Sequence, residues 1–237
     1  MSIPAQNVYR NTAILIILII IGVQWGFYAP YTSQFPTFKN STTVIHIHGA
    51  LLMTWLLLLV VQPMLIHMNK AKLHRSIGKV SYVLGPLIIV FIYLVGKGSF
   101  NRSIGKISEH DNLAIMALDS RGLFSFAIIW ALAMLYRKTP AAHMRYMIGT
   151  GILGIGPGIG RGLISGFNLS LWDALSITDA IGLLIVGVML VVDITKKNNY
   201  KPYLAVFVIL LSGSIIWQLR DSSMWQTFAA KYVALLY

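Results

Sequence analysis

Seven stretches of this 237-residue chain are apolar enough and long enough to cross a lipid bilayer, and few charges interrupt them. A helix needs about 20 apolar residues to cross the ~30 Å hydrocarbon layer, and it satisfies its own backbone polar groups there. The sequence therefore predicts one integral membrane domain over residues 1–237, an all-α bundle of seven transmembrane helices. We expect these helices at about 13–29, 43–66, 77–96, 113–136, 140–166, 172–194 and 202–219.

The end of the chain has a different pattern. Over residues 220–237, the apolar side chains of Trp225, Phe228, Tyr232 and Leu235 recur at helical spacing. This spacing predicts an amphipathic helix that lies in the membrane interface as an interfacial tail.

Composition agrees with a membrane protein, because 57% of the residues are hydrophobic and only 11% are charged. The chain has no cysteine, which excludes disulfides and thiolate metal sites. A net charge of +12 would favour a nucleic-acid partner in a soluble protein. In this chain we attribute the charge to membrane topology and to contact with anionic lipid headgroups, and we expect no nucleic acid.

Lysine and arginine are distributed unevenly between the two sets of loops. One set contains Arg10, Lys70, Lys72, Arg75, Lys79, Arg137, Lys138, Arg145, Lys196, Lys197 and Lys201. The other contains Lys39, Lys97, Arg102, Lys106, Arg220 and Lys231. The positive-inside rule then predicts a multi-pass membrane protein with its N-terminus in the cytoplasm and its C-terminus outside.

The fifth expected helix is rich in glycine. Gly154, Gly158, Gly162 and Gly166 follow one another at intervals of four, with Pro157 among them. Small residues at this spacing favour close helix packing, and the proline predicts a kink or a local break. A nucleotide-binding glycine loop is excluded, because no strand precedes the glycines.

Five ionisable side chains fall at a similar depth in the expected outer half of four helices. They are His48, Asp119, Arg121, Arg161 and Asp179. Unpaired charges at a depth of roughly 8–11 Å would be costly. The shared depth predicts a polar, water-accessible cavity, and a purely structural ion-pair network is the alternative. We expect Arg161 to pair with Asp179, because the short loop 167–171 makes their helices neighbours.

Helical geometry limits which of these side chains can converge. Residues two apart on a helix point about 200° apart, so Asp119 and Arg121 cannot face the same ligand. The same holds for His46 and His48. We expect His48 to point inward, because Gly49 beside it leaves room for a flat cofactor or for a close helix.

Two short motifs near the expected cytoplasmic ends join a histidine to a basic residue, His74-Arg75 with Gly78 and His143-Met144-Arg145. Together with Trp130, Arg137 and Arg161, they resemble an uncharacterised family of bacterial multi-pass membrane proteins, catalogued as domain of unknown function 2306. The resemblance covers about residues 45–165 and departs from the family pattern at Tyr146 and Gly149. It implies a multi-pass protein of the bacterial inner (plasma) membrane but no activity.

The order of four histidines along the chain also resembles the two-haem transmembrane cytochromes b. This likeness implies haem b between His48 and His110 on the outer side and between His74 and His143 on the inner side. Arg75 and Arg145 would then hold the haem propionates. His110 lies about eight residues shallower than His48, or ~12 Å along a helix, which opposes the outer pair. No metal site besides haem iron is expected.

The sequence thus predicts a membrane protein with a polar site in the outer half of the bundle. The first interpretation is haem-b binding with transmembrane electron transfer. A proton-coupled or anion transporter is the alternative, and so is a non-catalytic subunit of a membrane complex. A membrane-protein partner or a homo-oligomer fits each of these functions, and no catalytic residue is identified.

Overall fold

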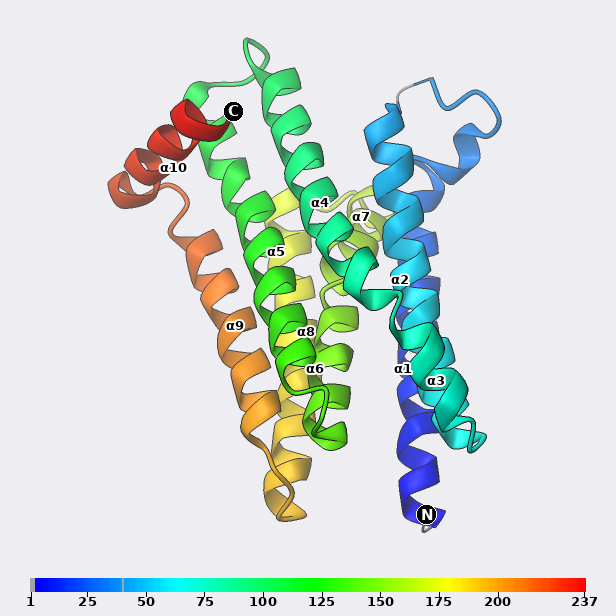
Figure 1. Cartoon of the computed structure of the whole chain (residues 1–237). Coiled ribbons are helices and arrows are strands. Elements are labelled where there is room, and N and C mark those ends of the chain that lie inside the picture. Colours follow the sequence, from blue (N-terminus) through cyan, green and yellow to red (C-terminus); the bar gives the residue numbers. More distant parts are fainter. Residues whose placement is uncertain (1–2, 40) are drawn as a thin grey trace.

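The computed structural model describes residues 3–39 and 41–237, and among these it contains helices and no strand (Figure 1). The elements are α1 (Ile3–Tyr28), η1 (Thr32–Gln34), α2 (Thr43–His67), α3 (Ala71–Gly78), α4 (Ser81–Ser103), α5 (Glu109–Leu135), α6 (Pro140–Ile152), α7 (Ile155–Phe167), α8 (Leu171–Thr195), α9 (Lys201–Gln218) and α10 (Ser223–Leu236). Within the described residues, seven helical segments are long and apolar enough to span a membrane, which confirms the predicted number.

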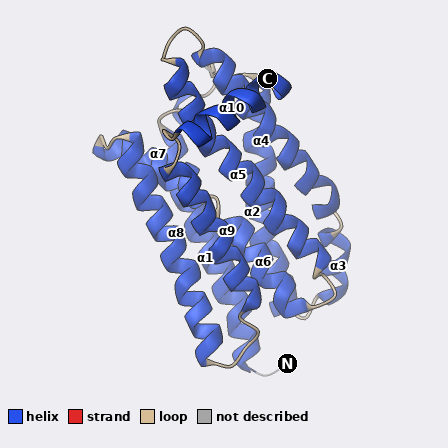
Figure 2. Ribbon diagram, turned by 90° about the vertical axis from the view of Figure 1, so that its left-hand side faces the viewer, coloured by secondary structure: helices blue, strands red, loops and turns tan. Residues whose placement is uncertain are grey.

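The long helices run side by side as one bundle, and α10 lies across one end of it (Figures 1 and 2). We call this end the α10 end. The opposite end holds α3 and the connection between α8 and α9, and we call it the α3 end.

The fifth span is broken, as the glycine-rich sequence predicts. The α6 half ends at Ile152 and the α7 half begins at Ile155, so the break falls at Leu153 and Gly154. Pro157 explains its position, because proline has no N–H to donate to the carbonyl four residues earlier and its ring clashes with that carbonyl. The carbonyl concerned is that of Leu153.

The third span differs from the expected helix at 77–96. The chain forms a short polar helix, α3, and then a longer one, α4, with Lys79 and Val80 between them. At the junction, the Ser81 hydroxyl donates a hydrogen bond of 2.6 Å to the Gly78 carbonyl. This bond satisfies a carbonyl at the end of α3 and stabilises the bend.

Glycines of α7 bring this helix against α1 with almost no side chain between them. A Cβ added to Gly26 would lie only 1.8 Å from the Gly158 carbonyl oxygen, and one added to Gly158 would lie 2.8 Å from Val23 Cα. The two backbones therefore touch, which is the close packing that the glycine spacing predicts.

An apolar layer crosses the middle of the bundle. The Trp55 ring packs edge-on against Phe126, with 5.5 Å between the ring centroids, and Ile88 and Ile129 are fully buried in the same core. Trp55 also donates its Nε1–H to the Thr150 hydroxyl at 3.1 Å. This layer separates polar groups at the α10 end from those at the α3 end.

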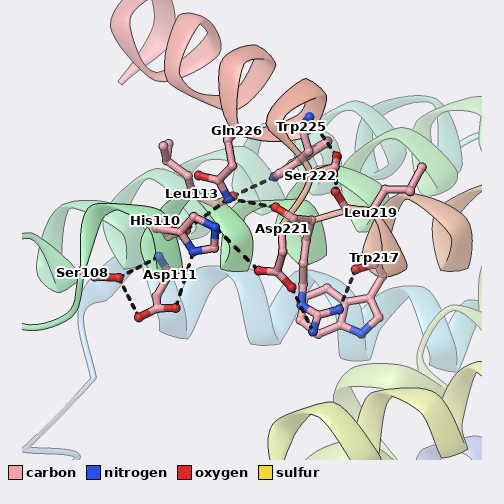
Figure 3. Close-up of polar contacts among 11 residues, drawn as sticks. Ser108, His110, Asp111, Leu113, Trp217, Leu219, Asp221, Ser222, Trp225 and Gln226 are labelled. Atoms are coloured by element: carbon pink, nitrogen blue, oxygen red, sulfur yellow. Dashed lines mark hydrogen bonds and ion pairs between the residues drawn. The ribbon is translucent and has the colours of Figure 1, made fainter.

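The tail of the chain forms α10, whose first half is fastened to α5 (Figure 3). Trp225 is buried and donates its Nε1–H to the Leu113 carbonyl at 2.9 Å, and Gln226 donates to the His110 carbonyl. Phe228 and Leu235 stay exposed on another face of the same helix. The helix thus carries apolar side chains both toward the bundle and away from it.

Candidate functional site

Two ion pairs fasten α8 to neighbouring helices, and one of them overturns an expectation. Arg121 Nη1 of α5 lies 2.6 Å from Asp179 Oδ2 of α8, and both side chains are mostly covered. The expected pair between Arg161 and Asp179 is therefore wrong.

α7 and α8 do pack together, as the short loop between them predicts. A Cβ added to Gly160 of α7 would lie 3.7 Å from the Thr178 Cγ2 of α8. The two charges nevertheless have other partners, because Asp179 is bound by Arg121 of α5 and Arg161 donates to a carbonyl of its own helix.

Arg161 instead lies in the half of the bundle toward the α10 end, with its side chain exposed. Its Nη1 donates to the Pro157 carbonyl at 3.1 Å, and the guanidinium lies 4.7 Å from the centroid of the Phe27 ring. The side chain is exposed, yet it interacts electrostatically with His48 of α2 and Asp119 of α5. In the part of the chain that the structure describes, no carboxylate lies within ion-pair distance of Arg161.

His48 adds a second unpaired polar group to this region. Its Nδ1 is buried and has no hydrogen-bond partner among the described residues. We call the group formed by His48, Asp119 and the exposed Arg161 the polar opening.

The expected divergence of neighbouring side chains is seen on α2 and α5. His46 turns toward the preceding loop, where its Nδ1 lies 2.6 Å from the Tyr31 hydroxyl, while His48 faces Arg161. Asp119 packs against Gly96 of α4, whereas Arg121 packs against Gly213 of α9. The predicted five-residue cluster is therefore two separate groups, the polar opening and the Arg121–Asp179 pair.

The polar opening has the chemistry of an anion site that also exchanges protons. A guanidinium offers five N–H donors in a planar fork, which matches the oxygens of a carboxylate or another oxyanion. His48 and Asp119 can each gain or lose a proton beside it.

A second polar group lies at the α3 end, around the histidines of the expected inner haem pair. His74 of α3 and His143 of α6 are both half-buried and interact electrostatically. His143 Nδ1 lies 2.8 Å from the Ala133 carbonyl oxygen, an arrangement that leaves Nε2 as the free acceptor.

His74 has a different neighbour in Gln62 of α2. The Gln62 amide satisfies both of its partners when its nitrogen donates to His74 Nδ1 and its oxygen accepts from the Gly78 N–H. His74 Nδ1 also lies 3.3 Å from the Gln62 backbone carbonyl oxygen, to which it donates when it carries the proton. In that tautomer Nε2 of His74 is free to bind iron, as Nε2 of His143 is.

The other residues of the haem expectation have other partners. Arg145 forms a two-bond contact with Asp193, with Nε and Nη2 at 2.6 and 2.8 Å from the carboxylate oxygens, so it is not free to hold a propionate. Arg75 is exposed. His110 lies at the rim of the α10 end, 3.9 Å from Asp111 and 4.0 Å from Asp221, while His48 belongs to the polar opening (Figure 3).

Gln62 and Asp193 belong to the polar groups of the α3 end, although neither was predicted from the sequence as a site residue. The sequence does contain a signal for both residues. A glutamine within an apolar span and a single acid at a basic end are costly unless they have a partner, so each predicts a polar contact. Gln62 partners His74, and Asp193 partners Arg145 and Asn198.

Comparison with known proteins gave no match: no family model, no curated protein and no solved structure matches this chain.

Proposed function

We propose that the protein is a proton-coupled transporter of a small anion, such as a carboxylate or another oxyanion. The observation that carries the proposal is the charge of Arg161, which has no carboxylate within ion-pair distance in the described structure and interacts electrostatically with His48 and Asp119. Unpaired charges inside a membrane bundle are costly, and they mark ion and substrate pathways.

In this proposal Arg161 binds the anion and the two titratable neighbours balance its charge. The guanidinium donates paired hydrogen bonds to the anion, which are stronger than bonds between neutral groups. A proton taken up by Asp119 or His48 compensates the negative charge that the anion brings. Anion and proton then bind together more favourably than either binds alone.

The route toward the α3 end is closed by the apolar layer around Trp55 and Phe126. Along α2, His48 and Gln62 are separated by about 21 Å, so no direct proton transfer joins the polar groups of the two ends. Transport therefore requires a second conformation in which this layer parts, as in alternating access.

The orientation in the membrane belongs to the same proposal. The α3 end carries exposed basic side chains, among them Lys72, Arg75 and Lys201. Such residues favour the cytoplasmic side and contact with anionic lipid headgroups, so the polar opening faces outward.

Purified protein in liposomes that contain a pH-sensitive dye tests the function. With an inward gradient of nitrate, chloride or formate, wild-type protein should carry protons inward together with at least one of these anions. Arg161→Gln should reduce the uptake at least roughly tenfold, because a charge-assisted contact is lost. Asp119→Asn should leave anion binding in place and abolish the proton signal.

Arg137→Gln is the matched control, because Arg137 is an exposed arginine that donates only to the nearby Met134 carbonyl in the described structure. It should transport as the wild type does. Uptake that equals that of empty liposomes, or uptake that Arg161→Gln leaves unchanged, would contradict the proposal.

Haem binding at the α3 end is the second candidate, favoured by the proximity of His74 and His143 and by the free Nε2 of His143. These two residues would hold haem b, which supplies one-electron chemistry when bound. An absorption spectrum of the purified protein tests it. A Soret band that disappears in His143→Ala supports haem, and a colourless, folded preparation rejects it.

A further inference from the structure

The last turn of α10 is tied to α4 by two side chains that share one acceptor. The Tyr93 hydroxyl and the Lys97 ammonium group both donate to the Leu236 carbonyl, the ammonium at 2.9 Å. Lys97 Nζ also lies 6.0 Å from the ring centroids of both Tyr93 and Tyr237. The residues that fasten this turn, Tyr93 and Lys97, we call the latch.

A small void lies beneath the latched turn. It has a volume of about 10 Å³, which is close to the ~10–15 Å³ that one water molecule needs. Its lining joins the apolar side chains of Ile92 and Leu123 to polar groups, which belong to Tyr93, Asp119, Ser120, Tyr232 and Tyr237. A Cβ added to Gly96 would lie 3.3 Å from the Tyr237 hydroxyl oxygen and 3.4 Å from Asp119 Cγ, so both polar groups border the same space.

The surroundings of the Tyr237 hydroxyl favour its protonated form. Burial, and after it the neighbouring Asp119 carboxylate, raises the pKa of Tyr237. The hydroxyl therefore remains a hydrogen-bond donor toward the void over the physiological pH range.

We propose that the last turn of α10 gates proton access to Asp119, and that the void beneath it holds the water that carries the proton. This inference rests on the proposed function, in which Asp119 exchanges the coupled proton. The groups that face Asp119 are Arg161 of α7, Tyr237 of α10 and the void-lining Tyr93 of α4, with His48 of α2 beyond Arg161.

Only one end of α10 has to move for this gate to open. The first half of the helix is held on α5 by Trp225 and Gln226 (Figure 3). The last turn depends on the latch and on contacts between the rings of Tyr237, Tyr93 and Phe100. Loss of the latch therefore frees the turn above Asp119 and leaves the rest of α10 in place.

The protonation of Asp119 can be followed without transport, by infrared spectroscopy of the full chain in lipid. The Asp119 carboxyl band is identified by subtraction of the Asp119→Asn spectrum, and its rate of change is measured after a pH jump. Tyr93→Phe with Lys97→Met should speed the response roughly tenfold, since two hydrogen bonds are lost. Gly96→Ala should slow it by a similar factor, because the added methyl group occupies the water site.

Gly98→Ala on the same helix is the control, since a Cβ there meets only the flexible guanidinium of Arg102. It should respond at the wild-type rate. Equal rates in the wild type and in the latch variant overturn the gate, whether or not Gly96→Ala folds. If the rates shift as expected but no anion gradient drives uptake, the gate stands and the proposed transport fails.

Discussion

At the scale of single residues, the buried charges divide into paired and unpaired ones, and the paired ones hold α8. Arg121 of α5 binds Asp179, and Arg145 of α6 binds Asp193. Removal of one partner of such a pair leaves the other charge stranded, whereas Arg161 has no carboxylate within ion-pair distance among the described residues.

This division predicts the outcome of double-mutant cycles. Arg121→Ala and Asp179→Ala should each destabilise the protein by ~3–5 kcal/mol, because each strands a buried partner, and the double substitution should cost less than their sum. The corresponding cycle between Arg161 and Asp179 should be additive within ~0.5 kcal/mol. The free energy of unfolding in mild detergent measures both cycles. Coupling between Arg161 and Asp179 without coupling between Arg121 and Asp179 would contradict these ion pairs.

The sequence predicted some of these relations and missed others for a physical reason. The divergence of Asp119 from Arg121 follows from the helical repeat alone, and the structure confirms it. The pairing of Arg161 with Asp179 relied on the adjacency of α7 and α8. Adjacency is correct, but it does not exclude a competing partner from a third helix, and Arg121 of α5 binds Asp179 instead.

At the scale of helices, glycine fixes the distance between α1 and α7. Gly26→Ala should destabilise the protein by several kcal/mol, since its methyl group would overlap the Gly158 carbonyl. Gly156→Ala on α7 is the matched control, because its methyl group would meet no atom within 4 Å. It should be neutral or slightly stabilising. Thermal unfolding in lipid nanodiscs distinguishes them, and equal effects would contradict the backbone contact.

Helix breaks were predictable only where proline or glycine marks them. Pro157 and the glycines around it indicated the break in the fifth span, although not that it falls at Leu153 and Gly154. The bend between α3 and α4 carries no such mark beyond Gly78. There the chain turns because polar residues follow α2 at the membrane boundary, and Ser81 stabilises the turn.

At the scale of the whole molecule, the proposed orientation is open to a direct test. Reporter fusions after residues 70, 138 and 198 should all report a cytoplasmic location, because the three connections at the α3 end share their basic character. A fusion after residue 106, at the α10 end, should report the opposite side. One reporter on the wrong side would overturn the orientation and place the polar opening in the cytoplasm.

The break in the fifth span, at Leu153 and Gly154, is a pivot about which the angle between α6 and α7 can change. α7 packs along α1 and α8, while α6 packs mainly on α5 and α9. Pro157 has removed the backbone bond to Leu153, and the bond from the Gly154 N–H to the Gly151 carbonyl is of the tighter three-residue kind, so the break has fewer backbone bonds than a regular helix. Arg161 lies seven residues beyond Gly154, and it would swing by about 1 Å for roughly each 5° of bend. A small rotation at the break therefore produces a larger displacement of the Arg161 guanidinium.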